Sequence, residues 1–267
     1  MSKTLYDDCV LNYFDFSSGS QYPSLRSLII AATPSPPVNI KFTIRGTSFP
    51  VQIPPHYSDR KAVNANIRNI TTQLFDKNGF QTIPVVLPKK LLAVHCGLAT
   101  FGKNNLCYVP GMGSYHRLTV FGSDLPVAEE NWLELKMLER CKRCKACIKC
   151  CPTGAIGNDR FVIKADRCLT NFNERLDPLP GWIDNRWHNS LIGCMKCQSV
   201  CPENKKSGTG SECSEEFSDT ETELILQGTA FQQLPTDLQT RIKNLCMDKY
   251  YRQLQRNLAL LIKMSFN

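Results

Sequence analysis

The sequence predicts an α+β protein with three parts: an α/β region, a small cysteine-rich module, and helices at its C-terminal end. Short apolar runs alternate with helical patterns over residues 1–135. Nine of the fourteen cysteines then fall between Cys141 and Cys201. Beyond residue 218, leucines and isoleucines recur at helical spacing. We expect an α/β domain at 1–135, a cysteine-rich domain at 136–205, a linker at 206–217, and a helical segment at 218–267.

The first elements are a strand and a helix. Residues 27–32 form an apolar run that a proline-rich stretch closes, which indicates a buried strand followed by a loop. Ser58 or Asp59 can cap a helix that Asn78-Gly79 would end. The apolar positions of this helix are Val63, Ile67, Ile70 and Leu74.

Further strands are expected at 82–87 and 118–121, with a short helix near 91–94. Residues 206–217 are rich in Gly, Ser and Glu, as linkers are. Ser218 and Glu221 match a capping box at the start of a helix. Apolar residues then predict helices that pack on the rest of the protein; they are Leu238, Ile242, Leu245, Leu254, Leu258 and Leu261.

The composition indicates how large a core the chain can bury, whether it spans a membrane, and what its cysteines bind. With 267 residues, 42% of them hydrophobic, the chain can bury a sizeable core. It has no apolar run of about 18 residues and its first residues do not resemble a signal peptide, so we expect a cytoplasmic protein with no membrane span. Reducing cytosol disfavours disulfides, and the clustering of the cysteines favours metal instead.

The run from Cys141 to Pro152 contains C-x₂-C-x₂-C-x₃-C-P, the spacing of bacterial ferredoxins. Such a loop brings three thiolates to one iron–sulfur cube, while the cysteine before proline ligates the other cube. A zinc site is the alternative, but zinc sites usually pair two C-x₂-C units without the final Cys-Pro.

A second motif, Cys194-x₂-Cys197-x₃-Cys201-Pro202, lacks a leading cysteine because Leu191 stands there, and Cys168 is the replacement. We assign two [4Fe–4S] clusters. One set of ligands is Cys141, Cys144, Cys147 and Cys201; the other is Cys151, Cys168, Cys194 and Cys197. Cys150 competes with Cys151, but the following proline favours Cys151. Structural or free thiols are expected at Cys9, Cys96, Cys107, Cys213 and Cys246.

The charge allows several partners. The formal net charge of +8 falls to about +4 once eight thiolates and two [4Fe–4S]²⁺ cores are included. This allows nucleic-acid binding without indicating it. Basic residues also lie among the cysteines, where they would bind tRNA, shield the negative cluster, or dock an acidic electron donor; they are Lys142, Arg143, Lys145 and Lys149.

These motifs resemble the double-cluster domain of epoxyqueuosine reductases, including the lone Cys168 and the Gly193-Cys194 junction. A second block, residues 97–105, resembles that family's G-L-x-x-x-G-K-N segment, and the pairs 113–114 and 123–125 follow at the expected places. The resemblance spans roughly residues 84–205, whereas the first 80 residues match only in pattern and are shorter.

The resemblance implies a cobalamin-reductase-like α/β domain beside a ferredoxin-like module. It also implies cobalamin between that domain and one cluster, reduced by electrons from an external donor of the flavodoxin or ferredoxin type. The residues that would line the corrin are Gly97, Gly102, Lys103 and Asn104. Alone, this segment is equally typical of a tight turn.

One feature departs from the family. Its aspartate, proposed to donate a proton to the substrate, would fall near residues 82–84, where no carboxylate stands; Asp76 and Asp124 are the nearest acids. Other proton donors are conceivable at His95, Tyr108, Tyr115 and His116, although each more often has an ordinary packing role.

Three functions follow. The first is an iron–sulfur oxidoreductase related to the epoxyqueuosine enzymes and acting on a different substrate. The second is a true epoxyqueuosine reductase that acts on tRNA. The third is a ferredoxin-type electron carrier that catalyses no reaction.

Overall fold

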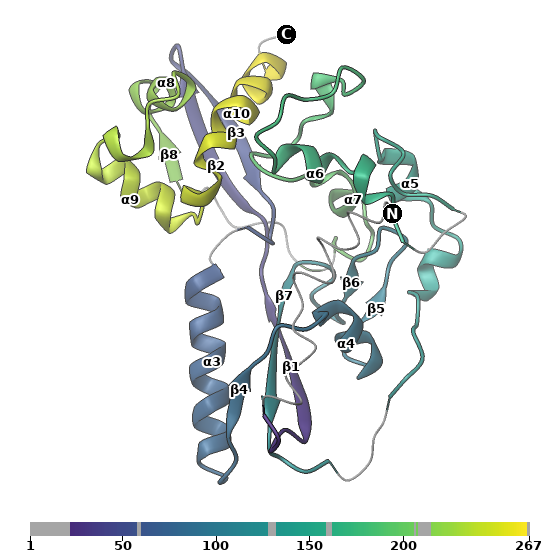
Figure 1. Ribbon diagram of the computed structural model, residues 1–267. Coiled ribbons are helices and arrows are strands. Elements are labelled where there is room, and N and C mark those ends of the chain that lie inside the picture. Colours follow the sequence, from purple (N-terminus) through teal and green to yellow (C-terminus); the bar gives the residue numbers. More distant parts are fainter. Residues whose placement is uncertain are drawn as a thin grey trace.

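The computed structural model describes residues 22–57, 60–127, 132–158, 162–205, 207 and 215–265. It confirms a mixed helix-and-strand fold (Figure 1). The expected features at Ser58, Asp59, Cys9 and Cys213 lie outside these residues. No helix in this part of the chain is both long enough and apolar enough to cross a membrane.

The first sheet has the order β1-β7-β4, and its neighbouring strands are antiparallel; they are β1 (Ser27–Pro34), β7 (His116–Ser123) and β4 (Thr82–Pro84). The strand predicted at 27–32 is therefore present, but it lies at the edge of the sheet and is half-buried rather than buried. The strand predicted at 82–87 ends at Pro84, because proline cannot donate to a strand ladder.

Helix α3 (Arg60–Asp76) lies beside β4, as Figure 1 shows, and Gly79 follows it with φ of +77°. Its predicted apolar residues are not all covered: Ile70 is 66% exposed and Leu74 is 57% exposed. Helix α4 (Lys89–His95) matches the short helix expected near 91–94. It precedes a hairpin of two short strands, β5 (Thr100–Phe101) and β6 (Cys107–Tyr108).

A second sheet joins distant parts of the chain. Its order is β3-β2-β8, with β2 (Val38–Ile44) antiparallel to β3 (Thr47–Ile53) and parallel to β8 (Glu215–Phe217). The last three residues of the predicted linker are thus a strand. Because β2 and β3 pair with a strand that precedes the C-terminal helices, the N-terminal region contributes to the C-terminal core. The domain boundaries stay a prediction.

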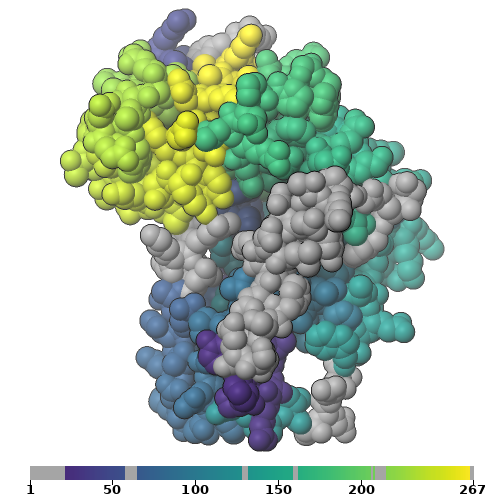
Figure 2. Space-filling view, in the orientation of Figure 1, coloured from purple at the N-terminus to yellow at the C-terminus, as the bar shows by residue number. Residues whose placement is uncertain are grey.

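The C-terminal helices are α8 (Asp219–Leu226), α9 (Thr236–Asn244) and α10 (Tyr251–Ser265). The capping box of Ser218 and Glu221 is present. The predicted apolar positions Leu238, Ile242, Leu254 and Leu258 are buried in the core over the β2–β3 sheet. Figure 2 shows this segment, in yellow-green, lying against the cysteine-rich region on the visible face.

Candidate functional site: two groups of thiols beside a pocket

The cysteine-rich region is built from short helical turns. They are η2 (Glu139–Lys142), α5 (Ala146–Cys150), η3 (Ala165–Arg167), α6 (Leu169–Asn173), η4 (Asn185–Trp187) and α7 (Lys196–Ser199). Such short turns bring closely spaced cysteines to one side of the backbone, as a cluster-binding loop requires.

One group of thiols surrounds a small cavity. Its lining includes all four cysteines assigned to the first cluster, namely Cys141, Cys144, Cys147 and Cys201. Burial, together with the neighbouring thiolates of Cys141 and Cys201, raises the pKa of Cys147 to about 11. Four anionic thiolates facing one cavity need positive charge between them, which an iron–sulfur core supplies.

The cysteines of the second group are half-buried, as are those of the first. Burial raises the pKa of Cys194, and Cys168 and Cys151 are near enough to raise it further. Burial likewise raises the pKa of Cys197 well above its ordinary value, with a further effect of Cys194. The four cysteines assigned to the second cluster therefore lie together. Within the described ranges, no three His, Cys, Asp or Glu side chains form a site for a single metal ion.

Cys150 has other contacts. Its Sγ donates hydrogen bonds of 3.4 Å to the carbonyl oxygens of Cys147 and Lys196. Cys150 also lies near Cys151 and Cys197, so its exclusion from the ligands stays a prediction that rests on the proline after Cys151. Of the other cysteines that the structure describes, Cys96 is exposed, Cys107 is buried and Cys246 is half-buried.

The glycine-rich segment lies against the thiols. The backbone N–H of Lys103 donates to Cys141, and Lys103 Nζ donates to the carbonyl oxygen of Cys144 over 3.4 Å. Buried Asn104 donates through Nδ2 to the hydroxyl of Tyr108 at 2.9 Å. Asn104 also hydrogen-bonds Cys197, and Tyr108 hydrogen-bonds Cys201, so this pair reaches both thiol groups.

The two glycines of this segment have different surroundings. A Cβ on Gly102 would stand 2.5 Å from the Tyr108 ring, so the close approach of Tyr108 requires glycine. Gly97 has φ of +79° and abuts Leu133. The corrin-lining role of Gly97, Gly102, Lys103 and Asn104 stays a prediction, and the structure places Lys103 and Asn104 in the wall of the first thiol cavity.

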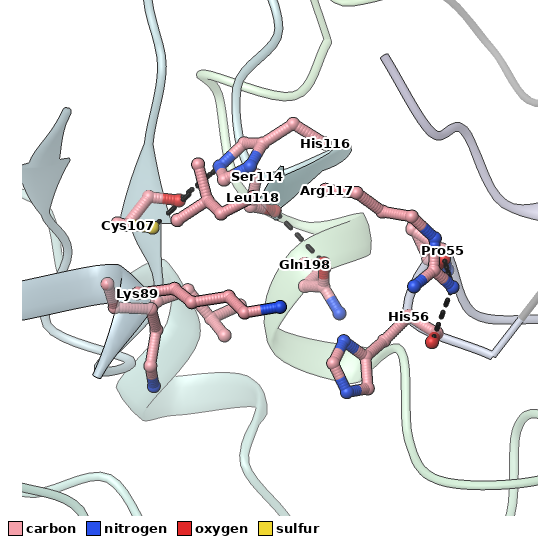
Figure 3. A pocket seen from close by; sticks show the side chains of 11 residues that line it. Pro55, His56, Lys89, Cys107, Ser114, His116, Arg117, Leu118 and Gln198 are labelled. Carbon is pink, nitrogen blue, oxygen red and sulfur yellow. Dashed lines mark hydrogen bonds between the residues drawn. The ribbon is translucent and has the colours of Figure 1, made fainter. Parts of the chain in front are cut away.

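A larger pocket of about 350 Å³ borders the cysteine-rich region (Figure 3). Gln198, which directly follows Cys197, forms one wall of it. Figure 3 shows Lys89 reaching across the pocket toward Gln198 and His56. On another wall, Arg117 donates to the carbonyl oxygens of Pro55 and His56 at 3.2 and 2.7 Å. None of its described lining residues is acidic.

Of the proton donors considered from the sequence, only His116 lies among the described residues of this pocket. Burial lowers its pKa, so the ring is neutral near pH 7, and its Nε2 lies 3.1 Å from the carbonyl oxygen of Cys107. His95 instead stacks on Trp132. Tyr108 and Tyr115 are buried tyrosines whose pKa values are raised by burial.

Among the described residues that line the pocket, no acid replaces the missing aspartate. Residues 82–84 form β4, and Asp124 accepts a hydrogen bond from the backbone N–H of Gln81 at 2.8 Å. The sequence patterns did not indicate four residues of the pocket: Lys89, Lys90, Arg117 and Gln198. The only sequence signal for them was the position of Gln198 beside a cysteine ligand.

A buried asparagine joins the module to the segment just before β7. Asn204 accepts a hydrogen bond from the backbone N–H of Ser114 at 2.7 Å and donates to the Ser114 hydroxyl at 2.8 Å. It also donates to the carbonyl oxygen of Gln198 at 2.9 Å. Gly113 has no room for a side chain there, because a Cβ would stand 2.3 Å from Asn204 Oδ1.

Comparison with known proteins supports this geometry. Residues 140–204 match the 4Fe-4S double cluster binding domain. Epoxyqueuosine reductase of Bacillus subtilis is 31% identical over 119 residues, which cover 45% of this chain and 30% of that protein. The enzyme of Escherichia coli is 33% identical over 128 residues, or 48% of this chain and 32% of that protein. The matched region is thus about a third of these relatives' length.

Solved structures show the same fold. Epoxyqueuosine reductase from Streptococcus thermophilus matches with a TM-score of 0.67 and 16% identity, over 97% of this chain and 69% of that chain. An epoxyqueuosine reductase bound to an epoxyqueuosine-modified tRNA stem loop matches with a TM-score of 0.65 and 19% identity, over 98% and 75%. The chain accordingly carries a 4Fe-4S double cluster binding domain at residues 140–204, and it is similar to epoxyqueuosine reductases in part of its sequence and in its fold.

Proposed function

We propose that this protein is an iron–sulfur reductase whose two [4Fe–4S] clusters pass electrons to a substrate or cofactor in the pocket beside Gln198. The observation that carries the proposal is the contiguity of three sites. Asn104 lines the first thiol cavity and is a neighbour of Cys197 in the second group, and Gln198, the residue after Cys197, lines the pocket.

The eight cysteines have the chemistry that two such clusters need. Cys141, Cys144, Cys147 and Cys201 would hold one, and Cys151, Cys168, Cys194 and Cys197 the other. When bound, the clusters supply electrons one at a time. The protein's own contribution is to solvate the sulfur atoms: Asn189 donates to Cys194 Sγ at 3.3 Å, and Asn104 donates to Cys197. Hydrogen bonds to sulfur set cluster potentials.

The pocket residues would orient the electron acceptor. Lys89 and Arg117 give the pocket a cationic character that suits an acceptor with an anionic group. His116 is neutral and lies at the wall, where it can exchange a proton with an acceptor. Reduction by electrons alone would leave negative charge on the acceptor, so a nearby proton exchanger favours the reaction.

A more specific form of this proposal is that cobalamin is the electron acceptor. The corrin-lining role of Gly97, Gly102, Lys103 and Asn104 stays a prediction; Lys103 and Asn104 also line the first thiol cavity, and Tyr108 lies against Gly102. A visible-spectrum titration of the cluster-loaded protein with hydroxocobalamin tests it. A base-off shift would identify cobalamin as the acceptor, whereas an unchanged spectrum would leave direct reduction or simple electron carriage.

Epoxyqueuosine reduction in tRNA is the second candidate, because the relatives bear that name. The absence of a carboxylate at residues 82–84 argues against it. The test is conversion of epoxyqueuosine in an anticodon stem-loop by the loaded protein, with a strong reductant and cobalamin present. No conversion would remove this candidate and leave a different substrate.

The number of clusters per chain can be tested separately. Anaerobically reconstituted protein should contain about eight iron and eight sulfide per chain, as two [4Fe–4S] sites require. A value near four would contradict the assignment of Cys168.

A further inference from the structure

Tyr57 extends from the loop after β3 into the cysteine-rich region, and its side chain is only 4% exposed. Its hydroxyl donates a hydrogen bond to Glu174, the residue directly after α6. A Cβ on Gly193 would stand 2.6 Å from the same hydroxyl oxygen, so Tyr57 also lies against Gly193. One tyrosine side chain therefore contacts two separate segments of the cysteine-rich region.

Both segments carry cysteines assigned to the second cluster. Gly193 immediately precedes Cys194 and has φ of +66°, a conformation that favours glycine. Glu174 follows the short helix α6, which begins directly after Cys168. Burial and then Glu174 raise the pKa of Tyr57, and nearby Cys168 adds to this effect. The hydroxyl therefore keeps its proton near pH 7 and stays a hydrogen-bond donor.

The residues just before Tyr57 are fixed to the first sheet. Arg117 on β7 donates to the carbonyl oxygens of Pro55 and His56, and all three residues line the pocket. The hydroxyl of Ser35, just after β1, donates to the Pro55 carbonyl oxygen at 3.0 Å. The loop is thus held to the first sheet by its backbone, and to the cysteine-rich region by the side chain of Tyr57.

Other contacts near Tyr57 hold backbone atoms. The buried Asn173 donates through Nδ2 to the carbonyl oxygen of Gly193 at 2.7 Å. Gln253 on α10 donates to the carbonyl oxygen of Glu174 at 2.8 Å. Within the part of the chain that the structure describes, the carboxylate of Glu174 accepts a hydrogen bond from Tyr57 alone. The position of this carboxylate therefore depends on the Tyr57 hydroxyl.

We propose that Tyr57 is a positioning residue for the second cluster. Its hydroxyl sets the spacing between the segments that carry Cys168 and Cys194, and holds both segments against the loop that borders the pocket. Partners outside the ligand shell orient metal ligands in this way, and they change the affinity and potential of the site when they are lost. This inference rests on the proposed function, because it requires a cluster bound by these cysteines.

The test compares Tyr57→Phe, which removes the hydroxyl and keeps the ring, with the matched control Tyr251→Phe. Tyr251 is also buried, and its hydroxyl donates to the carbonyl oxygen of Thr229 at 3.0 Å. The anaerobically reconstituted full chain is titrated with a reductant while its electron paramagnetic resonance spectrum is recorded. The signal of the second cluster is the one that Cys151→Ala removes.

We expect Tyr57→Phe to shift the midpoint potential of the second cluster and to leave that of the first unchanged. Release of iron from the second cluster to a chelator should become about tenfold faster, because its ligands are less well oriented. Tyr251→Phe should leave both potentials unchanged and alter the release of iron by less than about twofold. Loss of the second cluster alone from Tyr57→Phe would support the same role.

Variants of Glu174 show whether the effect depends on the hydrogen bond. Glu174→Gln keeps an oxygen that can accept from Tyr57, so iron release should stay slow. Glu174→Leu removes the acceptor, and Tyr57→Phe added to it should cause no further shift of potential. A loss of packing alone would instead give the same additional shift with or without Glu174.

The outcomes separate this proposal from the proposed function. Unsubstituted protein with about four iron atoms per chain would contradict the proposed function itself, since the second cluster would be absent. With about eight iron atoms present, equal potentials and equal iron release in Tyr57→Phe and Tyr251→Phe would overturn the positioning role. So would an equal shift on changing Tyr57 in the presence and absence of Glu174.

Discussion

Asn204 and Ser114 are joined by a pair of short, buried hydrogen bonds. The backbone N–H of Ser114 donates to Asn204 Oδ1 at 2.7 Å, and Asn204 Nδ2 donates to Ser114 Oγ at 2.8 Å. Because Asn204 lies three residues after Cys201, this contact holds the end of the cysteine module to Ser114, a pocket residue just before β7.

Asn204→Leu should therefore weaken both the fold and the first thiol group. The substitution leaves the Ser114 N–H and the Gln198 carbonyl without their partner, and each such loss costs about 1–3 kcal/mol. We expect the free energy of unfolding to drop by about 3 kcal/mol, together with lost iron. Urea unfolding and iron analysis measure the two effects. Asn69→Leu, at an exposed site of α3, is the control.

Gly102→Ala should displace Tyr108. The new Cβ would stand 2.5 Å from the Tyr108 ring, and Tyr108 hydrogen-bonds both Asn104 and Cys201. We expect a changed electron paramagnetic resonance spectrum for the reduced cluster bound by Cys201. Gly181→Ala, where a Cβ meets nothing within 4 Å, should leave the spectrum unchanged. Identical spectra for both variants would show that Tyr108 does not influence the cluster.

The sequence predicted the cysteine module well because ligand spacing is local: one loop must bring Cys141, Cys144 and Cys147 together whatever surrounds it. It also predicted α9 and α10, since Leu238, Ile242, Leu254 and Leu258 repeat with a helical period and are buried. Both predictions succeed because ligand spacing and helical periodicity depend on residues that are close together in the sequence.

The β2–β3 hairpin was missed, although Ile40 and Phe42 alternate as a strand requires. Its turn is made by Arg45 and Gly46, both with positive φ, without the usual Asn-Gly signal. Its pairing with β8 joins Ile40 to Glu215, a contact that no local pattern reports. The pocket was missed for the same reason, because Lys89, Arg117 and Gln198 meet only in three dimensions.

Cys150 and Cys151 should differ sharply when each is replaced by alanine. Cys150 donates to two carbonyl oxygens, whereas Cys151 is near Cys168 and Cys194. We expect Cys150→Ala to keep about eight iron atoms per chain and Cys151→Ala to keep about four. Anaerobic reconstitution followed by iron and sulfide analysis measures this. The reverse order would place Cys150 among the ligands.

His188 should make stability fall as the pH falls. It is 1% exposed, neither ring nitrogen has a hydrogen-bond partner, and burial lowers its pKa to about 4, with a further effect of Arg256. Between pH 6.5 and 4 the unfolded chain therefore binds more protons than the folded protein, so the free energy of unfolding rises with pH.

This dependence can be isolated with the variant His188→Leu, which keeps an apolar side chain and cannot titrate. Between pH 7.5 and 5.5 the wild-type protein should lose about 1.3 kcal/mol more stability than the variant, because an imidazole that stays neutral in the folded state gains a proton on unfolding. Urea unfolding of both cluster-loaded proteins at the two pH values measures the difference. Equal losses would mean that His188 is protonated within the fold, so that its burial carries no pH-dependent cost.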